Sequence, residues 1–212
     1  MEAVAPNDVE LARRVAGEDH DSFVLLMRRN NRMLYRTARA ILKDEVEAED
    51  AVQEAYLLAY RTIGRFRGDA KLSTWLVRIV MNEAIGRLRK RNRSAELAVR
   101  LDGETDPDRA MPEQPEHAAQ RTQQRRIVER KIDSLPDALR VVFILRALEE
   151  MSVQEVAATL DIPEATVRTR FFRAKHLLRK ALATGALPVD TFAFAGARCD
   201  GIAAIVLARL AQ

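Results

Sequence analysis

The segment from Met151 to Leu182 constrains the fold of this chain more than any other, because it has the pattern of a helix-turn-helix. Ser152, followed by Glu155 three residues later, predicts a capping box at the start of one helix. A second helix follows a short turn at Asp161 and Ile162, and Pro163 suits its first position because an N–H there has no helical partner. An apolar stripe predicts the face that this helix turns toward a core, at Val167, Phe171, Ala174, Leu178 and Ala181.

The opposite face of this second helix is basic and carries one aromatic residue. Arginine can pair with guanine in the major groove, threonine can contact a base or a phosphate, and phenylalanine can cover a thymine methyl group. We therefore predict a DNA-reading face formed by Arg168, Thr169, Phe172, Arg173 and His176. The alternative is a solvated basic helix in a bundle, but the aromatic residue among arginines and the short turn favour DNA binding.

The composition sets limits on the rest of the chain. Its 212 residues allow one or two domains with a core, and a formal net charge of +4 makes the position of charges more informative than their sum. The single cysteine, Cys199, excludes an internal disulfide, and a redox-sensing role for it is the less favoured alternative to simple burial. We find no secretory signal and no apolar run of roughly 18 residues, so we expect a cytoplasmic protein without membrane insertion.

The first 93 residues are predicted to form a helical domain. Helices are expected from Asn7 or Asp8 to Gly17, from Asp21 to Leu42, from Val46 to Ile63, and from Ser73 or Thr74 onward. The second of these carries a basic face that we expect to be solvated, formed by Arg28, Arg29, Arg32, Arg36 and Arg39.

The third expected helix has an edge that can be interpreted in two ways. Acidic residues near its start complement the positive end of a helix. The edge formed by Asp50, Gln53, Glu54 and Leu57 extends beyond that end, and a polar row interrupted by a leucine also suits a docking surface for another protein.

A basic loop, residues 65–73, and the helix after it form the second candidate nucleic-acid site. Phe66 between Arg65 and Arg67 suits stacking on an unpaired base, although it can also plug the core. The following helix ends in a basic cluster that is typical of phosphate contacts, at Arg87, Arg89, Lys90, Arg91 and Arg93.

Residues 94–117 change in character, because prolines, a glycine and several acidic residues replace the basic helix. We predict a flexible acidic linker there. A second helical domain, residues 118–182, contains the helix-turn-helix. The apolar extension, residues 183–212, is expected to end in a helix from about Cys199 to Leu210 that packs on the second domain, and a regulatory or partner-binding patch is the alternative. The predicted fold class is all-α, with two helical domains joined by the linker.

The order of these predicted helices, the linker and the helix-turn-helix resembles that of the extracytoplasmic-function (ECF) sigma factors of bacterial RNA polymerase, within the sigma-70 superfamily. Three stretches carry the resemblance: AEDAVQEAYLLAY at 48–60, FRGDAKLSTWLVRIVMNEAIGRLRKR at 66–91, and LPDALRVVFILRALEEMSVQEVAATLDIPEATVRTRFFRAK at 135–175. The chain departs from the family at Asp161, where a glycine is common, and in its extension beyond Ala183. Aspartate tolerates the left-handed conformation that the turn requires.

The resemblance implies a role for each predicted site. Residues Asp50, Gln53, Glu54 and Leu57 would dock on the clamp helices of the polymerase largest subunit. The minus-ten promoter element would be melted and held by Phe66, Lys71, Trp75, Asn82, Arg87, Arg89, Lys90 and Arg91. The minus-thirty-five element would be read by the face with Arg168, and the acidic linker would pass through the polymerase cleft. An anti-sigma factor is an expected further partner.

Two other classes of protein compete with this interpretation. A helix-turn-helix repressor or activator would act without polymerase, but the first 90 residues lack the alternating strands and helices of a receiver domain. An enzyme acting on nucleic acid could use Glu45, Glu47, Glu49 and Asp50 as metal ligands, but these acids crowd one helix start without partners. We therefore expect no catalytic residues, no metal and no cofactor.

Overall fold

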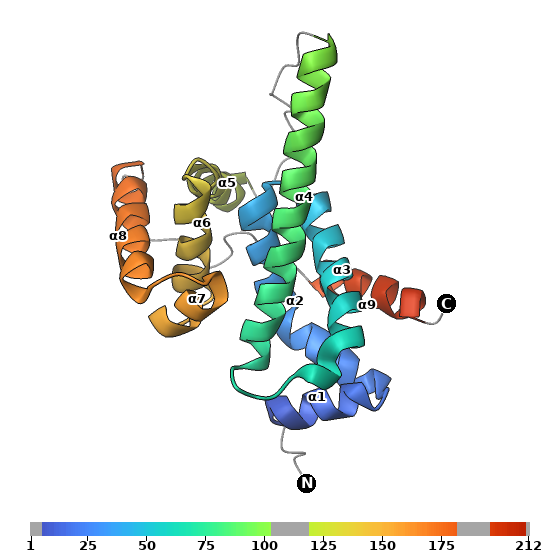
Figure 1. The fold of residues 1–212 in the computed structure, drawn as a ribbon. Coiled ribbons are helices and arrows are strands. Elements are labelled where there is room, and N and C mark those ends of the chain that lie inside the picture. Colours follow the sequence, from blue (N-terminus) through green and yellow to red (C-terminus); the bar gives the residue numbers. More distant parts are fainter. Residues whose placement is uncertain (1–5, 103–118, 182–195, 211–212) are drawn as a thin grey trace.

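The computed structural model describes residues 6–102, 119–181 and 196–210, and every regular element in these ranges is a helix. A first group of helices comprises α1 (Asp8–Ala16), α2 (His20–Leu42), α3 (Glu45–Thr62), a 3₁₀ turn (Ile63–Arg65) and α4 (Leu72–Asp102). A second group comprises α5 (Ala119–Asp133), α6 (Asp137–Phe143), a π-helical turn (Ile144–Leu148), α7 (Val153–Leu160) and α8 (Glu164–Ala181), and α9 (Gly196–Leu210) follows. Figure 1 shows the two groups side by side, which confirms the predicted all-α class for the described residues.

Side-chain caps determine where the helices of the first group begin. Asn7, Asp19 and Asp44 each accept a hydrogen bond from a backbone N–H in the first turn of α1, α2 and α3. The start of α4 differs from the prediction, because neither Ser73 nor Thr74 caps it. The N–H of Leu72 instead donates to a carboxylate oxygen of Asp8 at 2.8 Å, so a residue of α1 caps α4.

The end of α4 also differs from the prediction, since the helix continues to Asp102 and the linker was expected from residue 94. The intervening residues are mainly alanine, leucine, glutamate and arginine, all good helix formers. The first strong helix breaker is Gly103. The remainder of the predicted linker lies outside the described residues.

The second group of helices docks on a face of α2 that was expected to be solvated, and this expectation is wrong for two of its arginines. Arg36 is 2% exposed and pairs with Glu149 at 3.2 Å. Arg39 donates two hydrogen bonds to the Asp133 carboxylate, at 2.9 and 3.2 Å. Both partners lie in the second group, so these arginines join the two groups instead of facing water.

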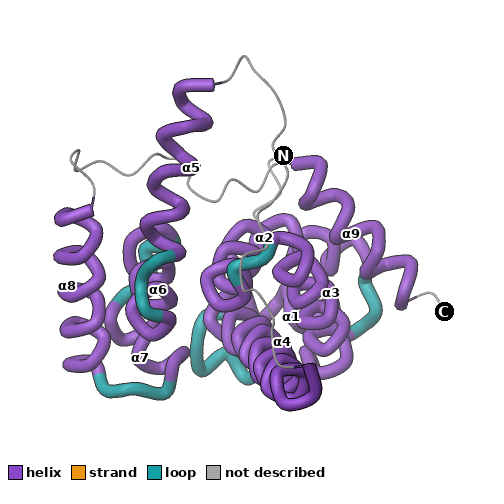
Figure 2. The backbone as a smooth tube through the Cα atoms, turned by 90° about the horizontal axis from the view of Figure 1, so that it is seen from above, coloured by secondary structure: helices purple, strands orange, loops and turns teal. Residues whose placement is uncertain are grey.

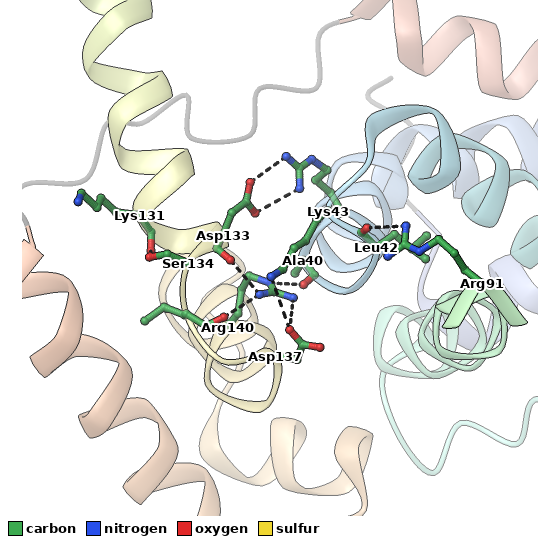
Figure 3. Close-up of polar contacts among 11 residues, drawn as sticks. Ala40, Leu42, Lys43, Arg91, Lys131, Asp133, Ser134, Asp137 and Arg140 are labelled. Carbon is green, nitrogen blue, oxygen red and sulfur yellow. Dashed lines mark hydrogen bonds and ion pairs between the residues drawn. The ribbon is translucent and has the colours of Figure 1, made fainter. Parts of the chain in front are cut away.

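Arg140 of α6 is the most completely enclosed charge at this contact, with no exposed surface. Its guanidinium donates to the backbone carbonyls of Ala40, Asp133 and Leu135 and to the carboxylate of Asp137, as Figure 3 shows. A buried charge is tolerated only when its hydrogen-bonding capacity is satisfied. The bond to Ala40 requires the end of α2, so Arg140 is satisfied only while the two groups are docked.

A second contact joins α4 to α7. The Lys71 ammonium lies 2.8 Å from the Glu155 carboxylate, and Arg78 donates a hydrogen bond to the carbonyl of Ala158. The apolar core is also shared, because Val142, Leu145, Met151, Val156 and Val167 belong to the same cluster as the core of the first group. The groups therefore form one packed body.

The C-terminal helix α9 does not pack on the second domain as expected. It lies across α2 and α3 of the first domain, as Figures 1 and 2 show. Ile202, Ala203 and Val206 are buried there and join the core cluster of the first domain. An apolar helix face indicates that a helix must pack but not against which partner, and here the partner is formed by α2 and α3.

Replacing Arg140 with methionine tests the contact between the two groups. We expect Arg140→Met to lower the free energy of unfolding by about 3 kcal/mol, because it leaves buried carbonyls without donors. Arg168→Met is the matched control, since Arg168 is 62% exposed and pairs only within its own helix. Its effect should stay within about 0.5 kcal/mol. Urea denaturation of both variants measures this, and equal losses would contradict the assigned role.

The Lys71–Glu155 pair makes a prediction about pH. The hydrogen bonds that the Lys71 ammonium and the Ser152 N–H donate to the Glu155 carboxylate lower its pKa from 4.5 to about 2. A lowered carboxyl pKa stabilises the fold above the ordinary pKa, and this contribution is lost as the pH falls toward 2. Lys71→Met should raise the pKa of Glu155, although the Ser152 bond keeps it below 4.5. Carbon-detected NMR titration measures it, and an unchanged pKa would show that the two groups do not meet here in solution.

Candidate polymerase and promoter interface

The helix-turn-helix forms as its residues predict. Ser152 and Glu155 exchange hydrogen bonds at 2.7 and 3.1 Å, which completes the capping box at the start of α7. Asp161 ends α7 with a φ of 52°, in the left-handed conformation that the turn requires. Pro163 lies one residue before α8 and accepts the first helical hydrogen bond, from Val167. The turn thus holds α8 against α6 and α7 with one face free.

The free face of α8 carries the five residues predicted to read the minus-thirty-five element. All five side chains are exposed: Arg168, Thr169, Phe172, Arg173 and His176. Phe172 is 73% exposed, which is unusual for a phenylalanine and leaves its ring free to contact a ligand. On the opposite face Val167, Ala174 and Leu178 are buried.

Two basic residues near this face were not predicted. A groove of about 340 Å³ runs along α8, and Lys175 and Arg179 line it together with Arg168, Phe172 and His176. Lys175 also lies over the Phe171 ring, at 5.5 Å from its centroid. The helix contains six lysines or arginines and one acidic residue, Glu164, so the face suits a polyanion. The positions of Lys175 and Arg179 could have been predicted from the sequence, because residues at i+7 and i+11 from Arg168 lie on the same face of a helix.

The basic loop of the first domain is partly engaged. Phe66 is half-buried and packs on the core beside Trp75, with ring centroids 5.9 Å apart, and stacking of its exposed part on a base stays a prediction. Asn82 is exposed, whereas the Lys71 ammonium forms an ion pair with Glu155. Phe66, Lys71 and Trp75 therefore lie near the start of α4, and Asn82 lies farther along the same helix.

The basic end of α4 divides into two kinds of residue. Arg89, Lys90 and Arg91 are exposed, and Arg91 also donates to the carbonyl of Leu42 at 3.4 Å (Figure 3). Arg87 is different, because its guanidinium lies 2.7 Å from Glu83 and 3.3 Å from Glu47. It ties α4 to the acidic start of α3, which makes it a structural residue in this conformation.

The predicted docking edge of α3 is only partly exposed. Asp50 is 53% and Glu54 39% exposed at the side chain, and Gln53 is half-buried. Leu57 was expected on the surface but is 4% exposed within the core cluster. Its neighbour Leu58 is 50% exposed instead, since the helix places it one step further around the edge.

Among the side chains that the structure describes, no three histidine, cysteine or acidic groups gather as metal ligands would. None of the described helices combines the length and apolar character needed to cross a bilayer. The Cys199 side chain lies outside the described residues, as does that of Ala181.

Comparisons with known proteins agree with these features. Residues 26–94 match the sigma-70 region 2 family, and residues 125–178 match the sigma-70 region 4 family. The chain is 36% identical over 184 residues to the RNA polymerase sigma-H factor of Pseudomonas aeruginosa, which covers 82% of this chain and 93% of the relative. It is 35% identical over 177 residues to the ECF RNA polymerase sigma-E factor of Escherichia coli K12, with 81% and 92% covered.

Solved structures show the same fold. The sigma factor RpoE, solved with the anti-sigma factor NepR from Bartonella quintana, superposes with a TM-score of 0.63 at 24% identity, covering 80% of this chain and 99% of that one. CnrH, solved with the cytosolic domain of CnrY, superposes with a TM-score of 0.58 at 23% identity, covering 84% and 99%. With both sigma-70 regions in order on this fold, the chain belongs to the ECF group of the sigma-70 family, whose members are promoter-specific transcription initiation factors.

Proposed function

We propose that this sigma factor binds core RNA polymerase through the exposed edge of α3 and reads its promoters with two separate surfaces. The docking surface comprises Asp50, Gln53 and Glu54, with Leu57 at its base. Its acidic character suits a basic partner surface, and its position on a rigid helix gives a defined orientation.

The first domain would hold the melted minus-ten element. Phe66, Lys71 and Trp75 lie near the start of α4 and Asn82 lies farther along it, and their aromatic rings and polar groups can hold an unstacked base. Farther along α4, Arg89, Lys90 and Arg91 would follow the phosphates, and Arg87 would join them only if it left its acidic partners.

The second domain would read the minus-thirty-five element through the free face of α8, and this face is the observation that supports the proposal most. Its exposed Phe172 among five basic side chains has no role in the core. The two elements are named for positions ~25 base pairs apart, or about 85 Å at ~3.4 Å per base pair. The readers must therefore separate from the docked arrangement when both elements are bound.

The proposal also covers the setting in which the chain acts. It would work in the cytoplasm, without a catalytic site or cofactor of its own, since polymerase performs the chemistry. An anti-sigma factor would hold it inactive, as the partners of the two structural neighbours suggest. The acidic linker between the domains would pass through the polymerase cleft.

Reconstituted transcription tests the proposal. The purified chain and bacterial core RNA polymerase are incubated with a library of genomic promoter fragments, and transcript starts are mapped by sequencing. We expect transcripts that share two sequence elements at fixed spacing, and their loss with Asp50→Arg, which reverses an exposed charge on the docking edge. Tight DNA binding without polymerase and without transcripts would instead favour a repressor.

The two reading surfaces should respond differently to the same substitution. Arg173→Ala should weaken binding to promoters with particular upstream bases by roughly 1–3 kcal/mol and relax specificity at those positions. Arg89→Ala should weaken binding to all sequences and reduce the salt dependence, because it removes a phosphate contact. Binding of the holoenzyme to matched promoter variants at several salt concentrations distinguishes them, and identical profiles for both variants would refute the assignment.

A further inference from the structure

The C-terminal helix α9 occupies a groove between α2 and α3 on the first domain. It enters the groove with Ile202, Ala203 and Val206, which are 2%, 8% and 0% exposed. Ile205, on the other side of the same helix, is 45% exposed. One face of the helix is therefore buried by this contact, and the other faces solvent.

One ion pair at each end of α9 is consistent with its direction across α2 and α3. Arg209 lies 2.7 Å from the Glu54 carboxylate of α3, and Asp200 lies 4.0 Å from the Arg28 guanidinium of α2. Reversing the helix would place each of these charges at the wrong end. The contact thus has a defined orientation as well as a defined face.

This position overlaps the docking edge of α3. Glu54, one of the docking residues, is neutralised by Arg209. Leu57, another, is 4% exposed on α3, the helix against which α9 packs. A protein partner that used Glu54 would have to displace Arg209, and with it the end of α9, first.

We propose that α9 is a built-in competitor for the polymerase-docking surface, so that the chain carries its own inhibitory helix. The proposal rests on the proposed function, since it takes the α3 edge as the polymerase contact. Free chain would exist mainly with α9 seated, and core polymerase would bind the fraction in which α9 has left. Apparent affinity is then reduced by the fraction of open molecules.

One isoleucine pair on α9 provides a matched test in the full chain. Ile202→Asp places a carboxylate in the buried face and should release the helix, whereas Ile205→Asp places the same group on the exposed face. If α9 is seated about nine-tenths of the time, release should tighten binding to core RNA polymerase about tenfold. Fluorescence anisotropy with a dye at the N-terminus measures the affinity, and Ile205→Asp should match the unchanged chain.

A second variant covers the case in which Ile202→Asp fails to fold. Arg209→Glu changes a side chain that is 42% exposed and replaces attraction to Glu54 with repulsion, without altering the docking edge. It should tighten polymerase binding about two- to fivefold, the range expected for an exposed ion pair. Circular dichroism melting identifies which variants are folded.

The outcomes separate this proposal from the one on which it rests. If folded variants bind polymerase with unchanged or weaker affinity than the parent chain, α9 is no competitor, although the sigma factor assignment stands. If neither the parent chain nor any released variant binds polymerase, the docking assignment fails and this proposal fails with it. Tighter binding by Ile202→Asp and Arg209→Glu, with Ile205→Asp unchanged, supports both.

Discussion

Two buried guanidinium groups hold this molecule together. Arg36 and Arg140 are 2% and 0% exposed. Arg36 pairs with Glu149 across the contact between the two helical domains, and Arg140 donates one of its hydrogen bonds across it, to the carbonyl of Ala40. Leaving such a group unpaired would cost several kcal/mol, so the docked arrangement is specific in a way that apolar packing alone is not. Apolar residues of both domains also pack together in one shared core. The domains are joined by a contact that must be exchanged for others when they separate.

This contact connects the fold to function, because groups proposed to face polymerase or DNA are engaged within the chain. Lys71 is bound to Glu155, Glu54 is bound to Arg209, and Arg87 is bound to acids of α3 and α4. Among the described residues of the predicted sites, those of the free face of α8 and of the basic end of α4 are exposed, as are Asn82 and Asp50. Under the proposed assignment, polymerase binding would replace these internal contacts with intermolecular ones.

The local features of the fold could be predicted from the sequence. The capping box at Ser152, the left-handed Asp161 and the helices α1 to α3 depend on residues within a few positions of one another. So does the reading face of α8, where an apolar stripe fixes which side is free. The exposure of its five predicted residues follows from helical periodicity alone.

The features that were missed depend on residues far apart in the chain. Arg36 and Glu149 are 113 residues apart, and Arg39 and Asp133 are 94 apart. No local pattern distinguishes such arginines from solvated ones. The burial of Leu57 and the position of α9 were missed for the same reason, since an apolar helix face shows that it needs a partner but not which one. Asp8 as the cap of α4 is a further example.

Hydrogen exchange of the free and polymerase-bound chain tests the central claim most directly, that polymerase takes the α3 edge in exchange for α9. Exchange reports local opening of each helix in the unmodified chain. On addition of core polymerase, we expect slower exchange in residues 45–62 and faster exchange in residues 196–210. Unchanged or slower exchange in residues 196–210, together with protection of α3, would contradict the account, because both helices would then lie in the complex as they do in the free protein.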